Sequence, residues 1–167
     1  MIEDTVVVFP NNAADIIATR IPAYCDPVPT DLTVFKRPLR STDPNQCCSV
    51  VPSIWTPTPE TAEIMGQPNF GHSLNRFIIT IQALIKDMDE PRGLARHSVL
   101  SAKLRGMLYR DGPLRVGLTA LSVVEGGRTE TVKQWGVNTQ RFLANEYPKG
   151  SFIFLSNLEL FLETESR

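Results

Sequence analysis

Residues 75–86 read NRFIITIQALIK, and this stretch decides how the neighbouring sequence is interpreted. Apolar side chains occupy every second position, at Phe77, Ile79, Ile81 and Ala83. A period of two places these side chains on one face of a β-strand, whereas an amphipathic helix would need a period of 3.6 residues. Because Ile78 and Leu84 add apolar side chains on the opposite face, the sequence predicts a central strand.

A helix is predicted directly after this strand. Asp89 and Glu90 would place carboxylates at its positive N-terminal end, and Pro91 suits the first turn, where its missing N–H would have no partner in any case. Asp111 and Gly112 are expected to end the helix. Its apolar stripe is predicted to comprise Leu94, Leu100, Leu104, Met107 and Leu108.

The C-terminal part of the chain predicts three further strands. Residues 121–125 and 128–135 flank Gly126-Gly127 and indicate a β-hairpin. Residues 151–164 (SFIFLSNLELFLET) alternate throughout, with Phe152, Phe154, Leu158, Leu160 and Leu162 inward. At about 3.3 Å per residue this strand extends roughly 46 Å, beyond a domain diameter of about 40 Å. We therefore expect either a bulge or projection of the strand toward a neighbouring subunit.

The order strand, helix, hairpin, strand favours an α+β fold in which helices pack on an antiparallel sheet. The N-terminal part differs, since ten of the 13 prolines lie between Pro10 and Pro68. We expect a short helix that begins at Asn11 or Asn12, carries Ile16, Ile17 and Ile21 on its apolar side and ends before Pro22.

The domain prediction has two parts. Residues 1–30 form the N-terminal helix and a linker, and residues 31–167 form the α+β domain with an extended, proline-rich loop or arm at 37–72. A strand is expected at 31–36, and residues 48–55 are the one stretch of the loop compatible with a further strand. So long a loop usually has a task, and its apolar side chains, Trp55 among them, would bury against a partner.

Composition narrows the function. The net charge is −1 in 167 residues, which argues against a general nucleic-acid binder and a polybasic membrane-surface protein. The three cysteines, Cys25, Cys47 and Cys48, are an odd number that includes an adjacent pair, as expected for reduced thiols. The start of the chain does not resemble a signal peptide, and no apolar run is long enough to cross a membrane. We therefore expect a soluble protein made inside the cell.

No pattern predicts a catalytic residue, a cofactor or a metal site, so we expect a protein that is not an enzyme. The cysteines and the two histidines show no zinc-ligand spacing. The cluster Asp87, Asp89 and Glu90 would suit a metal by charge, but it lacks the spacing of a calcium loop. Helix capping is the preferred interpretation.

Basic side chains concentrate between residues 92 and 115. One interpretation places them against phosphates, and the other makes them a solvated helix face. Arg92 and Arg96 share a face of the predicted helix, and the helix-face interpretation is preferred, so we expect no sequence-specific nucleic-acid recognition.

Five stretches carry a resemblance to a known family: RPLRSTDPN (37–45), WTP (55–57), LYRD (108–111), QRFL (140–143) and FIFLSNLELFLETE (152–165). Together they resemble the tail terminator (tail-completion) and minor tail proteins of long-tailed bacteriophages. The resemblance implies a subunit of a ring, expected to contain six copies, which caps the tail tube, ends its polymerisation and joins it to the head connector. Such a protein is assembled in the host cytoplasm and resides in the virion neck.

The resemblance also implies partners: copies of itself, the tail tube protein, the connector or stopper protein, and passing duplex DNA without sequence-specific contact. Closed rings are built from head-to-tail contacts. We expect subunit or partner contacts at Arg37, Pro38, Asp43, Trp55, Phe152, Phe154 and Leu158, and a surface facing the lumen at Arg92, Arg96, Lys103 and Arg105. The alternatives are another neck component, such as a connector or stopper, and a small nucleic-acid-binding or adaptor module.

Overall fold

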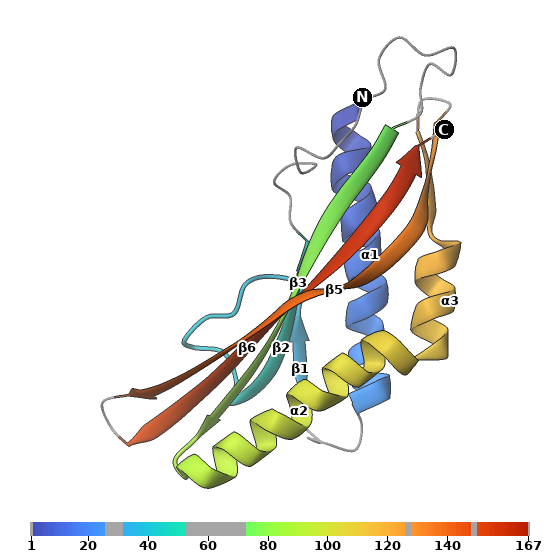
Figure 1. The fold of residues 1–167 in the computed structure, drawn as a ribbon. Coiled ribbons are helices and arrows are strands. Elements are labelled where there is room, and N and C mark those ends of the chain that lie inside the picture. Colours follow the sequence, from blue (N-terminus) through green and yellow to red (C-terminus); the bar gives the residue numbers. More distant parts are fainter. Residues whose placement is uncertain (1, 26–31, 53–72, 126–127, 148–149, 167) are drawn as a thin grey trace.

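The computed structural model describes residues 2–25, 32–52, 73–125, 128–147 and 150–166, which form a mixed α+β fold (Figure 1). Both ends of the chain lie at the same end of the molecule. The elements in chain order are α1 (Ile2–Cys25), β1 (Thr33–Phe35), β2 (Gln46–Pro52), β3 (Ser73–Asp87), α2 (Glu90–Arg110), α3 (Gly112–Ala120), β4 (Ser122–Glu125), β5 (Arg128–Tyr147) and β6 (Ser151–Ser166).

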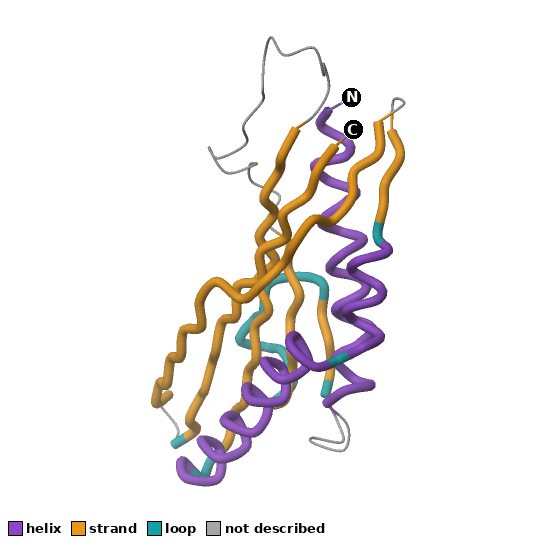
Figure 2. The backbone as a smooth tube through the Cα atoms, turned by 45° about the vertical axis from the view of Figure 1, so that its right-hand side comes forward, coloured by secondary structure: helices purple, strands orange, loops and turns teal. Residues whose placement is uncertain are grey.

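The six strands of the described residues form one curled sheet with the order β1-β2-β3-β6-β5-β4. Neighbouring strands are antiparallel except for β1 and β2, which are parallel. Figure 2 shows the helices gathered on one side of the sheet. The predicted α+β class with helices on a largely antiparallel sheet is therefore confirmed.

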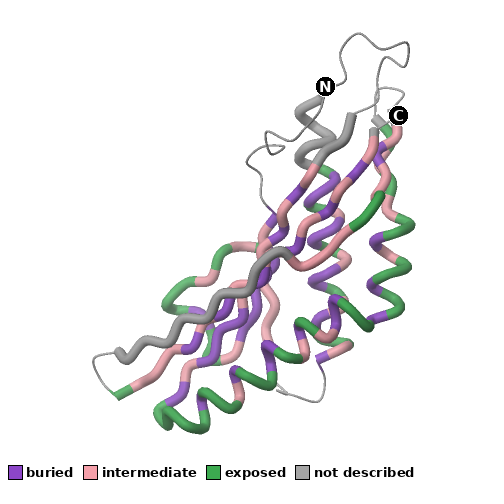
Figure 3. Tube along the Cα trace, in the orientation of Figure 1, coloured by how far each residue is buried: buried purple, intermediate pink, exposed green. Residues whose placement is uncertain are grey.

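The centre of the sheet is the ladder between β3 and β6, which pairs every residue from Ser73↔Ser166 to Asp87↔Phe152. The predicted inward faces are confirmed for Phe77, Ile79, Ile81 and Ala83 of β3, all at most 3% exposed. The buried residues of β6 alternate in the same way, as Figure 3 shows along the strand. Because α1, α2 and α3 pack on this face, the core lies between the helices and β3 and β6.

Helix α1 is longer than the sequence predicted. It begins at Ile2 instead of Asn11 or Asn12, and it continues through both Pro10 and Pro22 to Cys25. A proline inside a helix costs about 3 kcal/mol, but Phe9 is fully buried and stacks on Phe77 with ring centroids 5.6 Å apart. Burial of such a side chain is worth about 1.5–3 kcal/mol, so packing of this turn offsets the cost of Pro10.

The apolar stripe of α1 packs into the same core as the sheet. Ile17 and Ile21 are fully buried as predicted, and Ile16 packs against the core from its edge. The described parts of residues 1–30 and 31–167 thus share one hydrophobic core.

The start of α2 is confirmed as predicted. Asp89 is the N-cap, its Oδ1 accepts a 2.9 Å hydrogen bond from the backbone N–H of Arg92, and Pro91 lies in the first turn. The predicted stripe is buried except for Leu94, which is 43% exposed on the outer side of the helix. Asp111 does end α2, but it also begins α3, a helix that the sequence analysis did not predict.

Within the predicted loop at 37–72, residues 46–52 form β2 between β1 and β3. This confirms the strand considered at 48–55 over residues 48–52 and corrects the loop prediction at 46 and 47. Cys48 and Val50 of this strand are fully buried in the core, so their side chains pack within the chain and do not contact a partner. Residues 36–45 form the described part of the loop, and residues 53–72, with Trp55, lie outside the described residues. The predicted hairpin is confirmed by the β4–β5 ladder, which starts at Glu125↔Arg128. None of the described helices is long and apolar enough to span a membrane.

Two glycines of α2 should respond to alanine with opposite signs. A Cβ at Gly93 would lie 2.5 Å from Cε2 of Phe154 and 2.9 Å from Cβ of Asp87, whereas at Gly106 the nearest atom, Oη of Tyr24, is 3.5 Å away. We expect Gly93→Ala to lower the free energy of unfolding by about 1–3 kcal/mol through overpacking. Gly106→Ala should raise it by up to about 1 kcal/mol through helix propensity. Urea denaturation of both variants measures this, and equal signs would contradict the close packing of α2 on β6.

Candidate assembly interface

The loop at 36–45 carries three of the predicted contact residues, and two of them bind each other. The guanidinium of Arg37 donates to both carboxylate oxygens of Asp43 at 2.6 and 3.0 Å, and the backbone N–H of Arg40 donates to Oδ2 of Asp43 at 2.6 Å. The hydrogen bond from Arg37 lowers the pKa of Asp43 to about 2. Arg37 and Asp43 therefore shape the loop, while Pro38 is exposed on it.

This loop is fixed on the face of the sheet opposite the helices. The hydroxyl of Ser49 donates to the backbone oxygen of Arg37 at 2.6 Å, and Nζ of Lys86 donates to the backbone oxygens of Ser41 and Asp43 at 2.6 and 2.7 Å. These contacts join the loop to β2 and β3. The loop is thus ordered before any partner binds, which reduces the entropy that binding would cost.

The predicted contacts on the last strand are placed differently. Phe154 and Leu158 are 3% and 1% exposed in the core, and Phe152 packs against the core at the end of the sheet. β6 pairs with β3 along one edge and with β5 along the other. The expected projection of this strand toward a neighbour is therefore wrong, because both of its edges are already hydrogen-bonded within the chain.

The edge that is open belongs to β5. On one side β5 pairs with β6 from Glu130 to Tyr147, but on the other side β4 reaches only residues 128–131. Among the described residues, no strand pairs with this side of β5 beyond Thr131. The backbone N–H and C=O groups along residues 132–147 that point away from β6 therefore lack a strand partner in the described part of the chain.

One part of this edge carries features that hinder pairing with a further strand, and the other part does not. Lys133 and Asn138 each fall at a register shift against β6, where the ladder is interrupted. Bulges and lysines are devices by which proteins keep sheet edges from pairing. Residues 139–147 (TQRFLANEY) pair with β6 without interruption and contain neither proline nor lysine. We call residues 139–147 the open β5 edge; it is a regular template for another strand.

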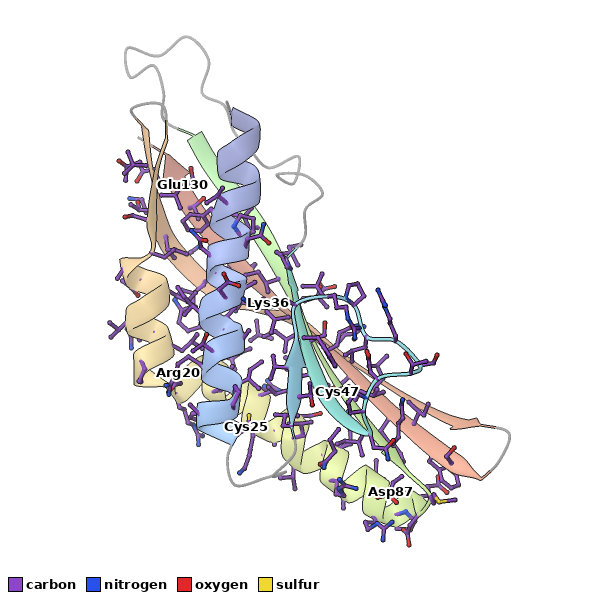
Figure 4. All side chains as sticks on the ribbon, turned by 180° about the vertical axis from the view of Figure 1, so that it is seen from behind. Arg20, Cys25, Lys36, Cys47, Asp87 and Glu130 are labelled. Carbon is purple, nitrogen blue, oxygen red and sulfur yellow. The ribbon has the colours of Figure 1, made fainter. Side chains whose placement is uncertain are left out.

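The residues predicted to face a lumen lie on α2, and two of them bind the same carboxylate. Arg92 donates from Nη2 to Oδ1 of Asp87 at 2.6 Å, and Arg96 donates from Nη1 to Oδ2 of Asp87 at 3.0 Å. Figure 4 shows Asp87 at the start of α2. The pKa of Asp87 lies well below its ordinary value, mainly because Arg92 donates hydrogen bonds to its carboxylate. The structure thus brings Arg92 and Arg96 together around a buried carboxylate and leaves Lys103 and Arg105 further along the helix.

Two open clefts adjoin α2. One has a volume of about 700 Å³ and is lined by Arg92 and Arg96 together with Lys86 and Met88. The other, of about 680 Å³, includes Arg105 and the polar group His97, Ser101 and Ser156. The described residues contain no cluster of three or more side chains suited to hold a metal ion.

The polar group below the second cleft is a buried network. The hydroxyl of Ser101 lies 3.4 Å from Nε2 of His97 and 3.1 Å from the hydroxyl of Ser156. His97 is 2% exposed, and burial lowers the pKa of its imidazole. These contacts provide hydrogen-bond partners for polar side chains that are buried where α2 packs on β6.

Lowering the pH should destabilise the fold through His97. Its pKa is depressed in the folded state, so below the unfolded value of about 6.5 the unfolded chain binds a proton that the folded chain does not. The free energy of unfolding should therefore fall as the pH drops below about 6.5, by at most about 1.4 kcal/mol per unit, until His97 also becomes protonated. The difference between wild type and His97→Gln, measured by urea denaturation from pH 7.5 to 5, should follow this course. A difference independent of pH would contradict it.

The three thiols are buried and weakly acidic. Burial raises the pKa of Cys25 and of Cys47 to about 11, and it raises the pKa of Cys48 well above the ordinary value. All three are free. Because the thiolate is the reactive form, these cysteines are poor nucleophiles near neutral pH.

The feature that sequence reasoning missed is the open β5 edge, since the predicted strand ended at Trp135. The direct signal was QRFL at 140–143, whose apolar residues Phe142 and Leu143 lie outside every predicted element. Comparison with models of known protein families finds no match, and comparison with curated proteins finds none either.

Proposed function

We propose that this protein is a structural subunit of the neck or tail of a long-tailed bacteriophage. In this proposal it forms a ring, expected to contain six copies, that caps the tail tube, ends tube polymerisation and joins the tube to the head connector. The observation that carries the assembly role is the open β5 edge. The viral setting rests on the resemblance of the sequence stretches described above.

An unpaired strand edge favours assembly because its backbone groups gain hydrogen bonds when another strand is added. Nine residues at about 3.4 Å each make the open β5 edge about 30 Å long. Soluble proteins usually blunt or cover such an edge, because it otherwise promotes aggregation. The interruptions of the ladder at Lys133 and Asn138 hinder pairing there, but residues 139–147 contain no such interruption. This is the pattern expected of an edge that binds a defined partner.

The proposed mechanism follows from the geometry of closed rings. A head-to-tail contact uses unlike surfaces of the two neighbours and closes when the rotation is right. One face of such a ring would bind the last layer of the tail tube, and the other, which cannot accept a tube subunit, would bind the connector while DNA passes through the centre. The ordered loop at 36–45, with Pro38 exposed, is a second surface available to these partners.

The test is deletion of the coding region in the parent virus, followed by electron microscopy of the particles. Abnormally long tails without heads would support a tail terminator. Tails of normal length beside heads that lose DNA would assign the protein to the connector or stopper instead. Particles indistinguishable from wild type would overturn a structural role in the neck.

A further inference from the structure

The first of the two clefts beside α2 lies where β3 ends and α2 begins, at the position of Asp87 in Figure 4. β2 starts at Gln46, so Lys86 and Asp87 at the end of β3 extend beyond it. The loop at 36–45 passes beside them, and the backbone N–H of Lys86 donates to the backbone oxygen of Asn45 at 2.8 Å. We call this space the β3–α2 cleft. Its volume of about 700 Å³ is typical of sites that bind small molecules.

The β3–α2 cleft is basic. The side chain of Asp87 is 2% exposed, whereas those of Arg92 and Arg96 are 64% and 35% exposed, so the carboxylate lies behind the two guanidinium groups. The carboxylates of Asp89 and Glu90, in the first turn of α2, do not line the cleft. The charged side chains that do line it are three cations and one carboxylate, with a net charge of +2: Lys86, Arg92, Arg96 and Asp87.

The cations of this cleft are held in place but keep unused donors. Nε and Nη2 of Arg92 and Nη1 of Arg96 donate to Asp87. Nη1 of Arg92 and both Nε and Nη2 of Arg96 have no acceptor among the described residues. Nζ of Lys86 donates to two backbone oxygens of the loop and has a third proton to give. Because these side chains are already ordered, a ligand that binds them loses less entropy.

The unused donors and the net charge match a phosphate monoester. Guanidinium groups bind phosphate oxygens in a planar, bidentate manner, and the ammonium group of a lysine adds a compact positive charge. A phosphate monoester carries close to two negative charges near pH 7. A carboxylate carries only one, and so does each phosphate of a DNA backbone. A group with two negative charges is therefore the anion that best balances this cleft.

The rest of the cleft has room for a body attached to the phosphate. Pro44, Met88 and Ile153 provide apolar walls. Oε1 of Gln46, another lining residue, is buried and has no hydrogen-bond partner in the described part of the chain. Because Gln46 as a whole is partly exposed, rotation of its amide would let Oε1 accept from a hydroxyl group of a ligand. A nucleoside monophosphate combines an apolar ring system, a hydroxyl group and a phosphate monoester.

We infer that the β3–α2 cleft binds a phosphate monoester of about the size of a nucleoside monophosphate, with the phosphate held by Arg92, Arg96 and Lys86. This site goes beyond the proposed function and does not rest on it. The deletion phenotype of the virus does not depend on ligand binding in this cleft, so the proposed function and the inferred site can fail separately.

The test is isothermal titration calorimetry of the full-length chain at physiological ionic strength, with adenosine 5′-monophosphate as the probe. We expect saturable binding of one molecule per chain and no binding of adenosine, which lacks the phosphate. Absence of binding at millimolar concentrations would overturn the inference. Equal binding of adenosine would overturn it as well. A DNA duplex without terminal phosphates is the third probe, and binding of this duplex in place of the monophosphate would assign the cleft to backbone phosphates instead.

Arg96→Gln and Arg105→Gln form a matched pair on α2, because each removes one positive charge. Arg96 lines the β3–α2 cleft, and Arg105 lines the other cleft. Loss of hydrogen bonds between charged groups should weaken binding by roughly 10- to 100-fold in Arg96→Gln. Arg105 is nine residues further along the helix, about 13.5 Å, beyond the screening length of about 8 Å. Its variant should keep the wild-type affinity, and equal weakening in both variants would overturn the inference.

Met88 offers a second pair of variants that leaves every described hydrogen bond of the cleft in place. Its side chain is 76% exposed, so neither Met88→Glu nor Met88→Gln should change the melting temperature. Met88→Glu adds a carboxylate to the lining and should weaken binding of adenosine 5′-monophosphate by at least about fivefold through charge repulsion. Met88→Gln adds no charge and should keep the wild-type affinity. An unchanged affinity of Met88→Glu would overturn the inference even if Arg96→Gln failed to fold.

Discussion

Replacing Asp111 by alanine is expected to lower the free energy of unfolding by about 3 kcal/mol, combining a lost helix cap with lost hydrogen bonds to a charged group. Asp111 is 7% exposed and lies where α2 ends and α3 begins. Its carboxylate accepts from Nε and Nη2 of Arg20 at 2.7 and 2.9 Å and from the backbone N–H of Leu114 at 3.2 Å. One side chain thus joins α1 to the junction of α2 and α3, near which Figure 4 shows Arg20.

The magnitude follows from the two roles of the carboxylate. Loss of an N-cap costs about 1 kcal/mol, and loss of a hydrogen bond between charged groups costs about 1.5–3 kcal/mol. The guanidinium of Arg20 is 27% exposed and can return partly to water, which limits the total. Urea denaturation measures the change. A loss below about 1 kcal/mol would show that the junction of α2 and α3 does not depend on this residue.

Asp111→Asn separates the two roles, because asparagine is as good an N-cap as aspartate but carries no charge. The hydrogen bond from Arg20 lowers the pKa of Asp111 in the folded state. The stability that this pair contributes is therefore present above the unfolded pKa of about 3.9 and is lost as the pH falls through the folded value. We expect Asp111→Asn to lie between wild type and Asp111→Ala at pH 7 and to lack this acid-dependent loss.

Asp111 also shows how far local sequence signals reach. The signal that predicted α2 was Asp89-Glu90-Pro91, a capping carboxylate two residues before a proline. The same spacing recurs in Asp111-Gly112-Pro113, which starts α3. Because Gly112 follows Asp111, the sequence analysis interpreted this site only as the end of a helix. In the structure, Asp111 both ends α2 and begins α3. This missed helix was therefore predictable from the same local rule.

The missed length of β5 has a different cause. The predicted alternation stopped at Trp135 because the strand breaks its own period of two. Val132 pairs with Thr164 and Gln134 with Glu163, so Lys133 is one extra residue in β5, and Asn138 is another between Val137 and Thr139. A bulge moves the inward position by one residue, so a search for strict alternation ends there. Only the neighbouring strand reveals that the ladder continues.

The candidate interface was predictable only in part. The sequence singled out Arg37, Pro38 and Asp43, and the structure places all three on one ordered loop. The sequence also predicted subunit contacts on the last strand. The predicted length of that strand is confirmed, but both of its edges are already paired within the chain. The open β5 edge depends on which strands lie beside each other and on where β4 ends. These are properties of the whole sheet, and local periodicity does not contain them.

The second large effect is expected at Leu158, which the sequence analysis placed in a subunit contact. The structure buries this side chain to 1% exposure, on β6 opposite Ile81. Leu158→Ala should therefore lower the free energy of unfolding of the isolated chain by about 2–5 kcal/mol, as for other leucines removed from a core. The same loss should lower the melting temperature, by about 2–4 °C for each kcal/mol in a chain of this size.

Leu155→Ala is the matched control, because it removes the same atoms from the same strand on the other face of the sheet. Leu155 is only partly buried, and it pairs with Leu84 on the side away from the helices. Its smaller buried area predicts a loss of about 1 kcal/mol. If Leu158 instead served a subunit contact, Leu158→Ala would leave the melting temperature of the isolated chain unchanged and would weaken association. A larger loss at Leu158 than at Leu155 would show that the inward face of β6 stabilises the single subunit, so that a subunit contact has to be sought on other surfaces, such as the open β5 edge.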